Sequence, residues 1–383
     1  MKTTTTAEEI RKAYENRTVR EDDPYRLRLH LMPPVGWMND PNGLCQKDGT
    51  YHIFYQFSPQ SVWGGNKAWG HYTTTDFLHY TDCGIALYPD TDLDRDGVYS
   101  GSAVTKDDVM HIFYTGNVME EGNHDYVHTG RGHNVMHVTS RDGFSFSARQ
   151  CVFTNADYPK ECTCHVRDPK VEKIGDRYYM LLGARTKDDK GRILLYESTD
   201  LETFVYCGDF HTEYTFGYMW ECPGLVNLEG NLFLMLSPQG IPAETYRYQN
   251  VHNNGYFTLK GTIPTAQCVK EFTELDIGFD FYAPQTFVDE KGRTILIGWM
   301  GLGDTDYTNP TTEYGWQHAR TLPRQLKAVN GKLTQTVIEE LTELRTSERY
   351  CPANEICQPA DNVFELEIPV TKESFSLQLR SDV

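Results

Sequence analysis

The chain has 383 residues, of which 39% are hydrophobic and 13% aromatic, and its formal net charge at pH 7 is −18. This length accommodates two or three average domains or one large β-rich domain. Because the charge is strongly acidic and no Lys- or Arg-rich run occurs, nucleic acid and anionic membrane surfaces are not expected as partners.

The first 23 residues are expected to form a short helical extension, because Thr6 and Glu9 have the spacing of a capping box. The segment lacks the apolar core of a secretory signal, and no run of 18 apolar residues occurs, so we expect a cytoplasmic chain without a membrane span. Residues 162–165 (CTCH) lack a second ligand pair at zinc-site spacing. We therefore expect reduced cysteines and no metal.

Five segments between residues 30 and 330 share one pattern, a polar turn followed by a hydrophobic strand. The strands begin at Tyr51, Met110, Tyr178, Leu232 and Thr294. A weaker repeat follows three of them, at 75–77 (TDF), 141–144 (RDGF) and 199–201 (TDL). A period of roughly 50–70 residues with about four strands per unit predicts an all-β chain with a five-bladed β-propeller. A large β-sandwich is the alternative, and a parallel α/β fold is disfavoured because no helical periodicity separates the strands.

The pattern changes after residue 335. Residues 336–346 (TVIEELTELRT) are expected to form a short connecting helix, and 363–369 (VFELEIP) and 374–380 (SFSLQLR) alternate as strands do. Two strands alone bury too little surface to be stable, so we expect the start of a C-terminal β-sandwich that this chain does not complete. The expected parts are a helical extension (1–23), the propeller (24–335), a connecting segment (336–350) and the partial sandwich (351–383).

Three of the five units carry an acid ten or eleven residues before the repeated strand. These acids are Asp40, Asp168 and Glu221. Equivalent positions of a propeller are related by rotation about its axis, so side chains on the innermost strands would converge on one axial pocket. Since gathered carboxylates repel one another, their convergence argues for a chemical task. Paired carboxylates are what glycoside hydrolysis requires, one as proton donor and the other as nucleophile or base.

The neighbours of two acids add to this hypothesis. Arg167 precedes Asp168, and a guanidinium can keep a carboxylate ionised and donate to sugar hydroxyls. Glu221 lies between Trp220 and Cys222. Apolar surroundings are expected to raise its pKa, as a proton donor needs.

The motifs around these acids resemble those of glycoside hydrolase family 32, the β-fructosidases that include invertase, sucrose-6-phosphate hydrolase, inulinase and levanase. The shared segments are 36–43 (GWMNDPNG), 99–104 (YSGSAV), 167–169 (RDP), 220–223 (WECP) and 279–286 (FDFYAPQT). The resemblance covers about residues 24–383 and implies a five-bladed propeller followed by a β-sandwich. Two features depart from the family: Gly224 stands where many members carry Asp, and fewer residues follow the connector than the family's sandwich needs.

By motif, the resemblance implies a retaining mechanism with Asp40 as nucleophile, Glu221 as acid/base and Asp168 as transition-state stabiliser. It also implies a fructose pocket lined by Asn39, Gln56, Trp63, Trp69, Ser100, Arg167, Asp280, Tyr282 and Trp299. No metal or organic cofactor is expected. The expected reaction releases β-D-fructose from sucrose, sucrose 6-phosphate or short fructo-oligosaccharides through a covalent fructosyl–aspartate intermediate.

Several alternatives stay open at this point. A sugar in place of water would make the protein a fructosyltransferase, and a truncated, non-catalytic fructan-binding propeller would be expected to lack one of the carboxylates. Recognition of a phosphorylated sugar would need basic residues at the pocket rim, for which Lys67, Arg185 and Lys187 are candidates. Assembly into a homo-oligomer is a further open alternative.

Overall fold

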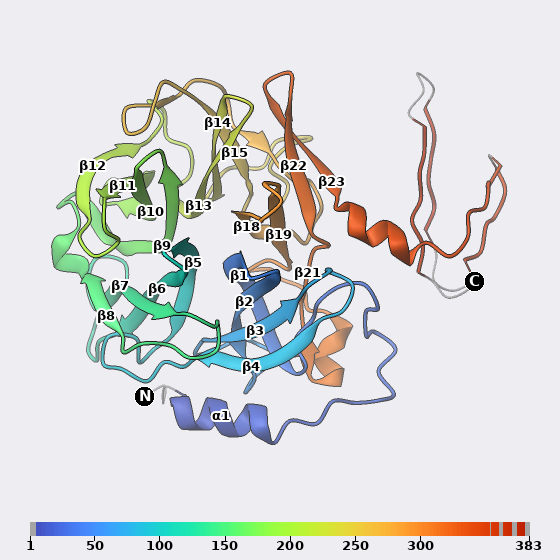
Figure 1. Cartoon of the computed structure of the whole chain (residues 1–383), viewed down its shortest axis with the longest axis horizontal. Helices are drawn as coiled ribbons and strands as arrows, with labels where there is room; N and C mark the ends of the chain where they lie inside the picture. The colour runs from blue at the N-terminus through green and yellow to red at the C-terminus, as the bar shows by residue number, and fades with distance from the viewer. Residues whose placement is uncertain (1–4, 353, 360–362, 370–373, 380–383) are drawn as a thin grey trace. The chain divides into compact units, whose positions relative to one another are not determined.

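The computed structural model describes residues 5–352, 354–359, 363–369 and 374–379. The chain divides into two units, Met1–Glu340 and Leu341–Val383. The described residues of the first unit form five mainly antiparallel sheets, which Figure 1 shows as a ring with one strand of each sheet toward the middle. This arrangement confirms the five-bladed β-propeller.

Each blade begins with its innermost strand. Blade 1 contains β1 (Gly36–Lys47), β2 (Thr50–Ser58), β3 (Ala68–Thr74), β4 (Thr81–Leu87) and β20 (Trp316–Gln317). Blade 2 contains β5 (Val98–Lys106), β6 (Val109–Met119), β7 (Arg131–Ser140) and β8 (Gln150–Phe153). Blade 3 contains β9 (Cys162–Ile174), β10 (Arg177–Thr186), β11 (Gly191–Ser198) and β12 (Val205–Phe210).

The last two blades are less regular. Blade 4 contains β13 (Met219–Leu228), β14 (Asn231–Gln239), β15 (Gly255–Lys260), β16 (Gln267–Cys268) and β17 (Thr273–Glu274). Blade 5 contains β18 (Tyr282–Val288), β19 (Thr294–Met300), β21 (Ala319–Arg320), β22 (Arg324–Val329) and β23 (Lys332–Val337). The short strand β20 pairs in parallel with β1, so a late segment of the propeller returns to blade 1 and closes the ring.

The helices are few and short among the described residues. They are α1 (Ala7–Glu15) and the 3-10 helices η1 (Asn155–Asp157), η2 (Pro310–Tyr314) and η3 (Glu339–Leu344). The capping box predicted for α1 is confirmed, because the Thr6 hydroxyl accepts from the Glu9 N–H at 3.2 Å and the Glu9 carboxylate accepts from the Thr6 N–H at 2.7 Å. None of the helices among these residues has the length and apolar character needed to span a membrane.

A tight turn after the third strand of blades 1, 2 and 3 explains the weaker sequence repeat. In residues 74–77, 140–143 and 198–201, the hydroxyl of the first residue accepts a hydrogen bond from the N–H of the last. The last residue of each turn has positive φ, and it is a buried apolar residue in the first and third turns. In the second turn it is Gly143, where a Cβ atom would lie 2.3 Å from the His52 ring. Blade packing therefore decides which residue occupies the same turn position.

The strands predicted near the C-terminus are not found. The described residues of 363–369 and 374–379 form no strand, and the larger apolar side chains among them are 37–70% exposed. Alternation alone does not make a ladder when no partner strand receives the N–H and C=O groups, so the two predicted strands are wrong for these residues. The β-sandwich and the expected domain boundaries stay predictions. Cys351 and Cys357 form a disulfide, contrary to the expectation of reduced cysteines, because their Cα atoms lie only 6.1 Å apart.

Candidate active site

The innermost strands carry a bulge at equivalent positions, and this irregularity presents the acids. The register of each inner strand against its neighbour shifts at residues 38–41, 98–101, 167–170, 221–224 and 282–285. A bulge re-aims side chains and tolerates a proline, since the extra residue need not donate to the ladder. Proline occupies four of these shifts, and Asp168 and Cys222 have positive φ within them. The five inner strands contact one another around a ring, so the bulged residues face a common centre.

Asp40 is held by three polar side chains from two blades. Its Oδ2 accepts from Ser100 Oγ at 2.5 Å and from Gln56 Nε2 at 3.2 Å, and its Oδ1 accepts from Asn39 Nδ2 at 3.3 Å. These donors stabilise the ionised carboxylate. Three of the sequence-predicted pocket residues are therefore brought together on Asp40.

Glu221 is held by a different set of donors. Arg167 donates Nε–H to Oε1 at 2.9 Å and a second N–H from Nη2 to the same oxygen. Tyr282 Oη donates to Oε2 at 2.6 Å, and Gln239 Nε2 donates to the same atom at 2.8 Å. Both carboxylate oxygens are thus occupied by strong donors.

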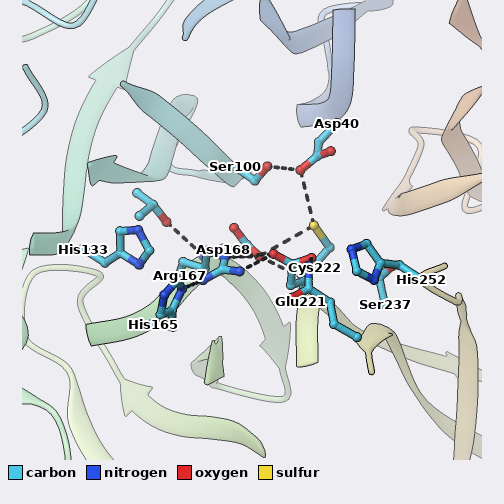
Figure 2. A network of polar contacts seen from close by, with 12 residues as sticks. Asp40, Ser100, His133, His165, Arg167, Asp168, Glu221, Cys222, Ser237 and His252 are labelled. Carbon is cyan, nitrogen blue, oxygen red and sulfur yellow. Dashed lines mark hydrogen bonds and ion pairs between the residues drawn. The ribbon is translucent and has the colours of Figure 1, made fainter. Parts of the chain in front are cut away.

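The third carboxylate, Asp168, lies next to the other two (Figure 2). Its Oδ2 accepts from the Cys222 N–H at 3.0 Å, and the Cys222 thiol lies 3.7 Å from that oxygen and 3.6 Å from Asp40 Oδ2. The buried thiol therefore bridges two of the acids. Arg167 Nε lies 4.0 Å from Asp168, so one guanidinium serves two carboxylates.

Burial and nearby charges shift the pKa values of the three acids in different directions. Burial raises the pKa of Asp40, against the Ser100 hydrogen bond, and the Glu221 charge raises it further. Burial also raises the pKa of Asp168, with Arg167 opposing and the two other carboxylates adding. The pKa of Glu221 is instead lowered, because the Arg167 charge and the Tyr282 hydrogen bond outweigh burial. The expectation that apolar neighbours raise the pKa of Glu221 is therefore wrong for this state of the site.

The tryptophan residues predicted to line the pocket differ in exposure and in distance from the carboxylates. Trp299 is 4% exposed, with its ring 6.3 Å from that of Tyr282, beside the carboxylates. Trp69 has no exposed surface, and its indole N–H donates to the Tyr99 carbonyl at 3.0 Å, which makes it a packing residue between blades 1 and 2. Trp63 is 63% exposed and has no hydrogen bond to any of the three acids.

Asp280 lies in the loop that leads into β18. Its Oδ1 accepts from Tyr307 Oη at 2.7 Å, and no hydrogen bond or ion pair joins it to Asp40, Asp168 or Glu221. The roles given to Trp63 and Asp280 stay predictions, because the described contacts do not bring them to the acids.

Two cations near Asp40 were not identified from the sequence as partners of this acid. Arg320 is 1% exposed, and its Nη2 donates to the main-chain oxygen of Asp40 at 3.0 Å; burial lowers its pKa to about 9. Lys67 lies over the Trp37 ring at 5.1 Å, and burial lowers its pKa to about 7 against the charge of Asp40. Arg320 is distant from Asp40 in sequence and joins it only through ring closure, so no local motif reveals it. Cys222 stands beside Glu221 in the WECP motif and could have been recognised as a site residue.

No cluster of three or more His, Cys, Asp or Glu in the part of the chain that the structure describes is arranged to hold a metal ion. His165, the last residue of the 162–165 segment, makes hydrogen bonds with Arg167 and with the Tyr126 carbonyl.

Comparison with known proteins gives a consistent result. Residues 30–337 match the model of the glycosyl hydrolases family 32 N-terminal domain. The chain is 41% identical to a sucrose-6-phosphate hydrolase of Bacillus subtilis, over 97% of this chain and 79% of that protein. A sucrose-6-phosphate hydrolase structure from Lactobacillus gasseri superposes with a TM-score of 0.78 at 30% identity, covering 89% of this chain and 68% of that one. A Bombyx mori GH32 β-fructofuranosidase mutant in complex with sucrose superposes with a TM-score of 0.75 at 32% identity, covering 88% and 69%.

Proposed function

Since the chain belongs to glycosyl hydrolase family 32, we propose that this β-fructofuranosidase releases β-D-fructose from sucrose or sucrose 6-phosphate by double displacement. The single observation that carries the proposal is the convergence of Asp40, Asp168 and Glu221 in one buried site, where each accepts at least one hydrogen bond that the other two do not. The substrate class is a small sugar, as in the sucrose complex of the Bombyx mori relative. A cytoplasmic location stays a prediction.

In the first step, the Asp40 carboxylate attacks the anomeric carbon of the fructosyl group, C2. Glu221 gives its proton to the glycosidic oxygen, and the leaving sugar departs as an alcohol. A fructosyl ester on Asp40 remains. The donors on Asp40, Ser100 and Gln56, support this role because they favour the ionised form that attacks.

In the second step, Glu221 removes a proton from water, which attacks C2 and regenerates Asp40 with net retention of configuration. The two roles of Glu221 need opposite protonation states. Esterification removes the negative charge of Asp40, and loss of a nearby like charge lowers the pKa of Glu221. The donors Arg167, Tyr282 and Gln239 hold the ionised form that this second step requires.

Asp168 is proposed to stabilise the positive charge that develops on the fructosyl ring. Asp168 is 4% exposed, the Cys222 thiol links it to Asp40, and its carboxylate lies close enough to both reacting acids for their charges to raise its pKa. In a site shielded from water, a fixed negative charge acts more strongly on a developing cation than it does in solvent.

The proposal is tested with Asp40→Ala, Glu221→Ala and Asp168→Asn. We expect each variant to lose several orders of magnitude in kcat for fructose release from sucrose or sucrose 6-phosphate, while circular dichroism shows an unchanged fold. Proton NMR of the first product formed should show the β anomer of fructose. Near-normal turnover in a folded Asp40 or Glu221 variant, or initial release of the α anomer, would refute the assigned roles.

A further inference from the structure

A cavity of about 480 Å³ lies between blades 1 and 2, away from the catalytic acids. Its walls are the turn between β1 and β2, the end of β3 with the residues that follow it, and the turn between β7 and β8. Strand β1 runs from Asp40 to Lys47, which lines the cavity, and at about 3.3 Å per residue this is roughly 20 Å. We call it the blade 1–2 cavity. Its volume is in the range of small-molecule sites, and the mechanism described above does not use it.

The turn between β7 and β8 departs from the blade repeat at this cavity. In the corresponding turns of blades 1 and 3, the fourth residue is a buried apolar side chain, Phe77 or Leu201. In blade 2 it is Gly143, whose N–H still donates to Ser140 Oγ at 2.9 Å. The apolar side chain comes one position later, as Phe144, which is 57% exposed and lines the cavity. The turn is therefore retained, but its apolar side chain is presented to solvent.

The Phe144 ring is supported from blade 1. It lies 5.4 Å from the His71 ring and 5.9 Å from the His52 ring, between centroids. These two buried histidines are joined by a hydrogen bond of 3.0 Å between His52 Nδ1 and His71 Nε2. Figure 1 shows the turn between β7 and β8 extending toward β3, which bears His71. Since the ring rests on other rings while over half of the residue is exposed, it offers a preorganised apolar surface.

The equivalent place between blades 2 and 3 gives a direct comparison. His111 and His137 stack there in the same way, with ring nitrogens 3.1 Å apart. In blade 3, however, Leu201 fills the fourth position of the turn, and the next residue is the exposed Glu202. Packing of this framework therefore does not require an exposed aromatic ring. The ring of Phe144 is a feature of the blade 1–2 cavity alone among these two places.

The charged groups of the cavity wall balance one another. The Lys47 ammonium donates to Asp48 Oδ2 at 2.5 Å and to Asp108 Oδ1 at 2.8 Å. Arg141 and the adjacent Asp142 also line the cavity, and Arg141 makes no hydrogen bond or ion pair with the residues that the structure describes. Threonine hydroxyls contribute further donors and acceptors to the wall. A ligand with a net charge of either sign would therefore meet groups of its own sign.

A neutral ligand with many hydroxyl groups suits such a wall. Each hydroxyl donates and accepts, and its hydrogen bonds to a guanidinium or a carboxylate are stronger than those between neutral groups. A sugar ring also has a C–H face that packs on an aromatic ring. We propose that the blade 1–2 cavity is a second, non-catalytic carbohydrate site, in which Phe144 packs on a sugar ring and Arg141 and Asp142 bind its hydroxyls. Neutral fructans and neutral glucans share this chemistry.

The test is affinity electrophoresis in native gels that contain inulin or soluble starch. The Asp40→Ala protein is used so that the fructan is not consumed, and Phe144→Ala and Arg141→Gln are each added to it. Binding at the axial pocket is common to all three proteins, so a difference in retardation reports the cavity. We expect at least one polymer to retard the Asp40→Ala protein. Its Kd should weaken about tenfold with Phe144→Ala, because burial of an aromatic face is lost, and severalfold with Arg141→Gln.

Tyr206→Ala, added to the same protein, is the matched control, because it removes an aromatic side chain that is 43% exposed on the outer strand β12. We expect it to leave retardation unchanged. In the parent enzyme, Phe144→Ala should leave kcat and KM for sucrose unchanged, because Phe144 lies far from the acids.

Retardation by inulin or by starch identifies which polymer the site takes, and either supports it. Absence of retardation by both polymers, or equal retardation with and without Phe144, overturns the proposal. An equal loss with Tyr206→Ala also overturns it, as does a fall in sucrose turnover with Phe144→Ala. Because retardation needs no turnover, the carbohydrate site stands if retardation persists in a protein that hydrolyses no fructoside, and the proposed function alone then fails.

Discussion

In the proposed mechanism, the Tyr282 phenol helps to set the pKa of Glu221, and the substitution Tyr282→Phe tests this role. The phenol donates to Glu221 Oε2 at 2.6 Å, while the ring packs in a cluster with Cys222 and Trp299 that a phenylalanine ring would also fill. The substitution therefore removes one donor and leaves the packing in place. Because that donor favours the ionised carboxylate, its loss raises the pKa of Glu221.

The magnitude follows from the remaining contacts. A hydrogen bond to a charged group contributes about 1.5–3 kcal/mol, and one pKa unit corresponds to about 1.4 kcal/mol. Arg167 and Gln239 still hold the carboxylate, so we take the low end, about one unit. In the proposed mechanism, the productive state has Glu221 protonated and Asp40 ionised. On the alkaline flank, the population of this state is limited by protonation of Glu221. On the acid flank, it is limited by ionisation of Asp40. Both statements hold whichever of the two acids has the lower pKa.

The assay is a pH profile of kcat/KM for fructose release by the parent and variant enzymes. We expect the alkaline flank of Tyr282→Phe to rise about tenfold relative to its acid flank, which is one unit in the pKa of Glu221. Tyr206→Phe is the control. Tyr206 Oη also donates to a carboxylate, Asp209 Oδ2 at 3.0 Å, but this pair lies in β12, at the opposite edge of blade 3 from its innermost strand. An unchanged or lowered ratio of the flanks in Tyr282→Phe would refute the role given to the phenol.

Two further substitutions test the neighbours of the site and the blade turns. Arg320→Met removes a buried charge that lowers the pKa of Asp40, so we expect kcat/KM on the acid flank to fall severalfold relative to the alkaline flank; an unchanged acid flank would contradict this. Gly143→Ala places a Cβ atom 2.3 Å from the His52 ring, whereas Gly230→Ala has the same φ of 79° and meets nothing within 4 Å. Urea unfolding should show Gly143→Ala less stable than Gly230→Ala by about 1–3 kcal/mol, and equal values would exclude the clash.

The blades could be predicted because each repeats a local pattern. The segments that begin at Tyr51, Met110 and Tyr178 fall in the second strands of their blades, where both faces are buried and most residues are apolar. The turn repeat is also local, since a hydroxyl and a main-chain N–H three residues apart close it. Local patterns of this kind can be recognised in a single sequence without any knowledge of the fold.

The rest of the site depends on contacts that no local pattern contains. Arg320 reaches Asp40 because the chain returns to blade 1 through β20, and Tyr282 reaches Glu221 from the next blade. The pKa of Glu221 was misjudged for the same reason. Its sequence neighbours are apolar, but its nearest charges come from Arg167, which is distant in the chain.

Asp40, Asp168 and Glu221 occupy equivalent bulges, so position alone does not indicate which is the nucleophile, which the acid/base and which the stabiliser. Their surroundings differ. Asp40 receives neutral hydroxyl and amide donors, Glu221 receives a guanidinium and a phenol, and Asp168 receives a main-chain N–H and a thiol. Because Glu221 is paired with the charged Arg167, its pKa depends on the charges around it. In the proposed mechanism this pKa must change between the two steps, since Glu221 acts first as an acid and then as a base. The neutral donors on Asp40 instead leave one carboxylate oxygen, Oδ1, with a single hydrogen bond of 3.3 Å. In the proposed mechanism this oxygen attacks, because it has the fewest hydrogen bonds to lose.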